Sequence, residues 1–221
     1  INGKNFDFAA RMLKYKTVKP GRYKLKEGMS LIELIRLLRS GNQDLVKMVI
    51  IKERTKELFA GKFGQGKKYA VATDSLQMIT YLNDVDKIKG LGLGVDTSTV
   101  MGLVLPYTYS VFWNTSPAGI MEQFTVAYKK FWTDERKRKA DSLQLTPIEV
   151  ITMASIVEEE TNKKEDKYKI ASVYLNRIKV GMPLQADPTV KFATRDFGLK
   201  RILSSHLKVV SPYNTYLNRG L

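Results

Sequence analysis

The stretch TPIEVITMASIVEEET at 146–161 contains three consecutive carboxylates near its end, Glu158 to Glu160. Carboxylates of this kind are candidates for acid–base chemistry. At about 100° per residue of helix, Glu160 projects from the same side as Met153 and Ile156. A carboxylate that continues an apolar stripe is either solvated near the helix end or buried with a raised pKa. A raised pKa is what a general acid working near neutral pH needs. The pattern alone favours the solvated helix end.

A complete helix start signal precedes these carboxylates. Thr146 is suited to cap the helix, Pro147 to occupy its first position, and Glu149 to complete a capping box. We also predict a helix from Ser116 towards Ser142 and another at about 165–180, with Tyr174 among its inward-facing residues. The C-terminal half of the chain is therefore predicted to be mainly helical.

The N-terminal half is predicted to be a small α/β unit. A predicted first strand, the extended stretch at 17–25 with its Pro-Gly turn, precedes a helix that begins with a capping box at Ser30 and stops at Gly41. A strand follows at 45–52. The aromatic-rich segment 103–113 is either a sugar-stacking surface or, more commonly, aromatic core. The predicted fold class is α+β, with segments 1–52, 53–95 and 96–221.

The composition describes a folded, basic protein. The 221 residues suffice for one core and a small second one, and hydrophobic residues make up 43% of the chain. The 37 basic and 22 acidic residues give a formal net charge of +15, which should attract polyanions. The dense basic run at 136–139 is predicted to be the solvated face of a helix.

Several kinds of site are excluded by the composition. The sequence contains no cysteine, so disulfides, a thiolate nucleophile and cysteine-ligated zinc are impossible. Its single histidine, His206, rules out a multi-histidine metal site. No window approaches the roughly 18 apolar residues of a membrane span, and no signal peptide is visible. We therefore expect neither a metal nor a cofactor.

Four motifs in order resemble those of a known family: ASIVEEET at 154–161, ASVYLNR at 171–177, GMPLQADPTV at 181–190 and SPYNTY with a following Gly-Leu at 211–221. The series is similar to the endolytic murein transglycosylases, the YceG-like family of membrane-anchored bacterial enzymes. The resemblance is dense from Thr146 to Leu221. It implies a lysozyme-like catalytic domain, and segment 21–41 is similar to the LysM-like subdomain that precedes it.

The resemblance implies a specific reaction. The family cuts the β-1,4 bond between N-acetylmuramic acid and N-acetylglucosamine in nascent peptidoglycan, and leaves a 1,6-anhydro end. One glutamate then suffices as acid and as base, because no water attacks. The Glu-Thr pair of the family falls on Glu160 and Thr161, so Glu160 is the first candidate and Glu158 the second.

The other motif residues are candidates for binding the substrate. Gln185 is expected to hydrogen-bond an acetamido group. Asp187 is preferred as a helix N-cap, and is otherwise a second carboxylate near the cleft. The polar, aromatic run Tyr213, Asn214, Thr215 and Tyr216 either holds a sugar and orients the glutamate or forms a structural turn.

Two other functions stay open at this point. A lysozyme-like muramidase would use water and a second carboxylate, for which Asp187 is the only motif candidate. A non-catalytic peptidoglycan-binding or scaffold protein would have no need of the Glu160–Thr161 pair. No nucleic-acid-binding signature accompanies the charge.

The resemblance also implies partners and a location. The expected partners are peptidoglycan strands and synthase or divisome proteins. The expected location is the cytoplasmic membrane, with an N-terminal anchor outside this sequence and the catalytic domain on the extracytoplasmic side. The family pattern continues past Gly220-Leu221, so a further C-terminal part of the catalytic domain is expected.

Overall fold

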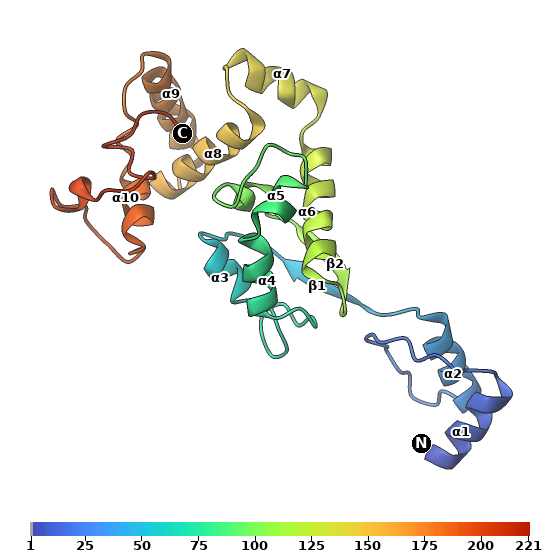
Figure 1. Ribbon diagram of the computed structural model, residues 1–221. Helices are drawn as coiled ribbons and strands as arrows, with labels where there is room; N and C mark the ends of the chain where they lie inside the picture. Colours follow the sequence, from blue (N-terminus) through green and yellow to red (C-terminus); the bar gives the residue numbers. More distant parts are fainter. Residues whose placement is uncertain (1) are drawn as a thin grey trace. The chain divides into compact units, whose positions relative to one another are not determined.

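A computed structural model describes residues 2–221 as an α+β chain of helices with a small two-stranded sheet (Figure 1). The chain divides into two compact units, Ile1–Phe131 and Trp132–Leu221. The predicted α+β class is confirmed. The finer division into 1–52, 53–95 and 96–221 stays a prediction, as does the LysM-like character of the first segment.

The first unit surrounds an antiparallel pair of strands with short helices. Its elements are α1 (Gly3–Met12), α2 (Leu31–Ser40), β1 (Leu45–Val49), α3 (Lys56–Ala60), α4 (Ser75–Leu82), α5 (Val85–Lys89), η1 (Val100–Leu103), β2 (Thr108–Phe112) and α6 (Pro117–Phe131). In the ladder, Val46 lies opposite Val111 and Met48 opposite Tyr109, and all four are buried. Alternate residues of both strands are exposed, which is typical of a sheet covered on one face.

The aromatic segment contributes to the core of this unit. Tyr109 is buried, and its ring meets that of Phe124 in α6 edge to face, with the centroids 4.6 Å apart. Tyr107 and Phe112 are exposed. The core interpretation is therefore right for Tyr109, whereas the exposed rings leave the sugar-stacking interpretation untested.

Two local predictions are wrong. No strand forms at 17–25, because β1 takes its hydrogen-bonding partner from β2, some sixty residues later. The single helix predicted towards Ser142 is divided into α6 and α7 (Asp134–Ser142). Thr133 caps the second helix by accepting a hydrogen bond from the Arg136 backbone N–H at 3.3 Å. The basic run at 136–139 lies on α7 and is exposed, as predicted.

The second unit is helical. It contains α7, α8 (Pro147–Glu160), α9 (Lys164–Lys179), α10 (Asp187–Thr194) and η2 (His206–Lys208). The predicted capping box is confirmed, since Thr146 caps α8 and exchanges both hydrogen bonds with Glu149. The predicted helix at 165–180 is α9. No helix within residues 2–221 is long and apolar enough to cross a membrane.

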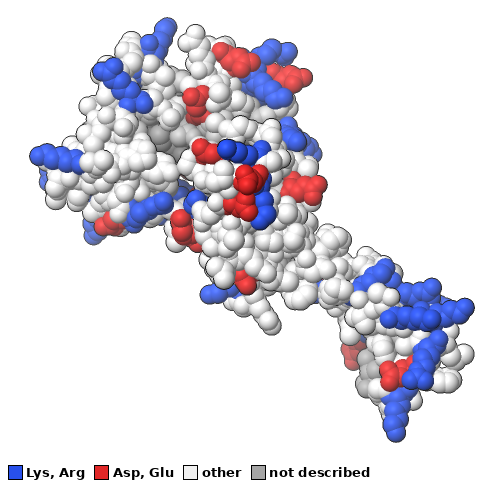
Figure 2. All heavy atoms as spheres, viewed as in Figure 1, with Lys and Arg blue, Asp and Glu red and all other residues white. Residues whose placement is uncertain are grey.

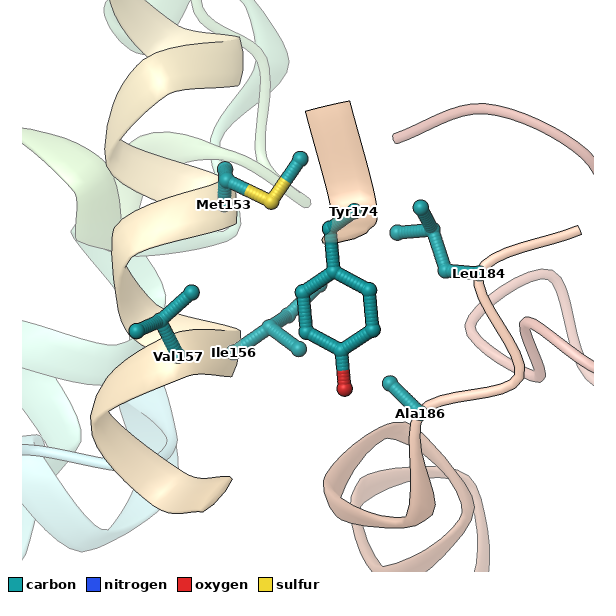
Figure 3. Packing of buried hydrophobic residues seen from close by; sticks show 6 residues of the cluster. All are labelled: Met153, Ile156, Val157, Tyr174, Leu184 and Ala186. Carbon is teal, nitrogen blue, oxygen red and sulfur yellow. The ribbon is translucent and has the colours of Figure 1, made fainter. Parts of the chain in front are cut away.

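A small apolar core fixes α8 against α9 and the loop before α10 (Figure 3). Its buried members are Met153, Ile156, Val157, Tyr174, Leu184 and Ala186. Arg177 of α9 donates a hydrogen bond to the backbone carbonyl of Leu184, which ties the helix to this loop. The end of α8 and the start of α10 are thereby held in a defined arrangement.

Candidate active site

A pocket of about 420 Å³ lies in the second unit, beside the end of α8 and the first turns of α10. Its lining is strongly charged and consists of Glu159, Glu160, Asp187, Pro188, Lys191, Lys200, Arg201 and Ile202. Carboxylates and cations therefore share one small, open site. Such a site can transfer protons and recognise charged groups.

Glu160 is the last residue of α8, and the chain leaves the helix at Thr161 in an extended conformation. The Tyr174 hydroxyl hydrogen-bonds its carboxylate. Burial of the carboxyl group raises the pKa of Glu160, and the negative charge of Asp187 raises it further. The hydrogen bond from Tyr174 and the charge of Lys191 oppose this rise without cancelling it. The negative end of the helix dipole also disfavours a carboxylate here.

Glu160 in turn affects the pKa of Tyr174. Burial and the adjacent Glu160 charge raise the pKa of Tyr174, so its hydroxyl stays a donor throughout the physiological range. Tyr174 itself is packed in the core. Glu160 as a whole residue is exposed at the end of its helix. The hydroxyl of the buried Tyr174 therefore restrains a carboxylate that would otherwise be free to move.

Asp187 is the second carboxylate of the pocket. Its Oδ1 accepts a hydrogen bond of 2.7 Å from the Tyr216 hydroxyl. Burial and this hydrogen bond raise the pKa of Tyr216 to about 12, so the hydroxyl keeps its proton. The predicted N-cap role of Asp187 is wrong: Ala186 is the N-cap of α10, and Asp187 opens its first turn with the carboxylate bonded to Tyr216.

The turn at 213–216 is held by buried hydrogen bonds. Asn214 is fully buried, and its Nδ2 donates to the carbonyls of Leu207 and Val209 at 2.9 and 2.8 Å. Thr215 is also buried, with its Oγ1 2.8 Å from the Thr189 Oγ1 and accepting from the Ala186 backbone N–H at 3.0 Å. The side chains of Asn214 and Thr215 thus hydrogen-bond to other groups of the protein. Both residues thereby fix the position of the neighbouring Tyr216.

The remaining predicted residues lie in different surroundings. Gln185 is exposed and has a left-handed backbone conformation, with φ of 51°. Its backbone N–H donates a hydrogen bond to the Thr215 carbonyl at 3.0 Å. Tyr213 is exposed, and its ring centroid lies 4.9 Å from that of Phe192. Glu158 is ion-paired with Lys167 of α9 and does not line the pocket. The structure thus brings together Glu160, Asp187 and, through Asp187, Tyr216.

Among the residues of this site that the sequence did not predict are Tyr174, Lys191, Lys200 and Arg201. Tyr174 was expected to face inward, but its hydroxyl had no predicted partner. Lys191 follows Asp187 by four residues, a spacing that places both on one face of a helix and was available as a signal. Nothing in the sequence indicated that the loop carrying Lys200 and Arg201 returns to the end of α8.

Comparisons with known proteins identify relatives of this chain. The model of the YceG-like family matches residues 1–221. An endolytic murein transglycosylase of Bacillus subtilis (strain 168) is 33% identical over 218 residues, which cover 91% of this chain and 58% of the relative. An endolytic murein transglycosylase of Streptococcus pneumoniae serotype 2 is 29% identical over 244 residues, which cover 100% of this chain and 44% of the relative. The chain therefore spans about half the length of these relatives.

The fold is found in a solved structure as well. A crystal structure of a YceG-like protein from Listeria monocytogenes superposes with a TM-score of 0.61 and 23% sequence identity. The match covers 100% of this chain and 75% of that one. At this identity the likeness is one of fold.

Proposed function

Because this chain belongs to the YceG-like family, we propose that it is a lytic transglycosylase that cuts the glycan strands of peptidoglycan. The observation that supports the proposal most is the state of Glu160. It ends a helix in an open pocket, carries a raised pKa and is held by a buried tyrosine. A raised pKa and a fixed position in an accessible pocket are what a general acid needs.

The proposed reaction begins at the β-1,4 bond between N-acetylmuramic acid and N-acetylglucosamine. Glu160 gives its proton to the glycosidic oxygen, and the bond from that oxygen to C1 of the muramic acid breaks. The resulting Glu160 carboxylate takes the proton of the C6 hydroxyl of the same sugar, whose oxygen then bonds to C1. No water is consumed, Glu160 ends protonated, and the product carries a 1,6-anhydro ring.

The neighbouring residues have supporting roles in this proposal. Tyr174 holds the Glu160 carboxyl in place. The Asp187 charge favours the protonated form of Glu160 and stabilises the positive charge that develops at C1, and Tyr216 orients Asp187. Gln185 and Tyr213 are exposed near the same turn and available to the sugar, whereas Asn214 and Thr215 act from the interior.

A second candidate reaction is hydrolysis of the same bond. Asp187 lies in the same pocket as Glu160, close enough to raise its pKa. An inverting or retaining muramidase needs two carboxylates at one site, and this pair meets that requirement. The products separate the two reactions, because hydrolysis leaves a reducing end.

The test is mass spectrometry of peptidoglycan digested by the protein and by two variants. Glu160→Gln keeps the shape of the side chain and removes the transferable proton, so we expect anhydro-ended fragments from the parent and none from this variant. The matched control is Glu158→Gln, which alters an adjacent glutamate outside the pocket and should retain most activity. Reducing-end products would favour the muramidase, and no product from the parent would favour a non-catalytic binder or scaffold.

The setting of the reaction is proposed from the family resemblance alone. The substrate would be nascent strands at the outer side of the cytoplasmic membrane, and the protein would be anchored by a helix outside this sequence. Peptidoglycan synthases or divisome proteins would be its partners there.

A further inference from the structure

Three cations share the pocket with Glu160. Lys191 lies on α10, and Lys200 and Arg201 lie on the loop that follows it. Within residues 2–221, neither Lys200 nor Arg201 forms an ion pair, and both side chains are exposed. Their charges are therefore available to a ligand that enters the pocket.

These cations are not explained by the acid–base role of Glu160. A positive charge beside a carboxyl group favours its ionised form, and the charge of Lys191 already opposes protonation of Glu160. Proton transfer by Glu160 alone gives no reason for further positive charges in the pocket. The general basic character of the chain, visible where Lys and Arg gather over α1 and α2 in Figure 2, does not require them at this position either.

The chemistry of the substrate supplies a reason. The sugars of peptidoglycan are uncharged, but each muramic acid carries a stem peptide on its lactyl group, and stem peptides bear free carboxylates. The bond that is cut begins at C1 of that same sugar. When this bond lies at Glu160, the stem leaves the sugar within a few ångströms of the pocket, so its carboxylates come within reach of long basic side chains.

We propose that Lys200 and Arg201 form a cationic subsite that binds a stem-peptide carboxylate, so that the protein prefers strands with charged stems over strands whose stem carboxylates are amidated. Arg201 is suited to a bidentate contact with a carboxylate, and Lys200 adds a second charge on the same loop. The inference rests on the proposed function and extends it to the choice of substrate.

The test compares two uncross-linked glycans, polymerised from lipid-linked disaccharides with free or with amidated stem carboxyl groups. We expect the parent to cleave the charged strand with a KM about five- to tenfold lower, with kcat changed less than about twofold. The double variant Lys200→Gln/Arg201→Gln should lose this preference. The matched control, Arg138→Gln/Lys179→Gln, removes two exposed charges of the same unit outside the pocket and should keep it.

A binding measurement separates this inference from the proposed function. Titration of a muramoyl peptide with free carboxyl groups into the Glu160→Gln protein, followed by NMR, requires no turnover. Weaker binding by the Lys200→Gln/Arg201→Gln change on that background supports the subsite even if the parent cleaves nothing. Equal binding, or equal KM values for both glycans with an active parent, overturns the subsite and leaves the proposed reaction standing.

Discussion

Asn214 offers a sharp test of the distinction between residues that touch the substrate and residues that hold the site. Its side chain is 0% exposed and donates two hydrogen bonds, to the carbonyls of Leu207 and Val209. Its Oδ1 accepts a third from the Tyr216 backbone N–H at 3.0 Å. Every polar group of the side chain is thus engaged by the protein. We predict that Asn214→Ala acts mainly on stability.

The magnitude follows from these three bonds. Each contributes about 1 kcal/mol net, and truncation leaves three backbone groups to find water, so the free energy of unfolding of the second unit should fall by about 3 kcal/mol. For a unit of this size, each 1 kcal/mol lowers Tm by roughly 4–8 °C. The transition of this unit should therefore move down by about 12–24 °C.

The assay is urea and thermal unfolding of parent and variant, followed by circular dichroism. The matched control is Asn218→Ala. The Asn218 side chain also donates to two carbonyls, those of Ser211 and Asn214, but it is exposed, so water replaces it at a cost below about 1 kcal/mol. A substrate-binding role would give the opposite result for Asn214→Ala: stability within 0.5 kcal/mol, on the order of surface changes, with cleavage lost. That outcome would refute the structural assignment.

Three further predictions concern other parts of the molecule. Asp187→Asn removes a negative charge that raises the pKa of Glu160. The basic limb of the kcat/KM–pH profile should therefore move to lower pH. An unmoved limb would show that Asp187 does not affect the pKa of Glu160. Glu53→Gln breaks the ion pair with Lys62, and the Glu53 side chain is only 3% exposed. The free energy of unfolding, measured in urea, should fall by about 2–3 kcal/mol, and a fall of less than about 0.5 kcal/mol would contradict this prediction. Thr146→Ala removes the cap of α8 and should lower the free energy of unfolding by about 1 kcal/mol in the same assay. The control Thr152→Ala, in the middle of the same helix, should change this free energy little. Equal effects of the two substitutions would argue against the capping role.

The parts of the fold that depend on local signals were predictable from the sequence. The capping box at Thr146, the helix stop at Gly41 and the strand at 45–49 are each encoded by neighbouring residues. The break between α6 and α7 is also encoded locally, by the N-cap Thr133 and the acidic residues Asp134 and Glu135 that follow it, although the single helix predicted towards Ser142 ignores this signal. Pairing was not predictable, since nothing local indicates that β1 joins β2 rather than the stretch at 17–25.

The candidate site shows the same division. The position of Glu160 on the apolar side of α8 followed from helical spacing, and its raised pKa agrees with that position. The contact of Asp187 with Tyr216 joins residues 29 positions apart and depends on the buried anchors Asn214 and Thr215, which no periodicity reveals. The choice between N-cap and pocket carboxylate for Asp187 could be made only from the structure.

The central claim is that Glu160 activates the C6 hydroxyl of the sugar and not a water molecule. The most direct measurement is digestion of purified glycan strands in water enriched in heavy oxygen, followed by mass spectrometry of the new ends. We predict anhydro ends that contain no heavy oxygen and that disappear with Glu160→Gln. New ends that carry one heavy oxygen atom each would show that water attacks C1, and would contradict it.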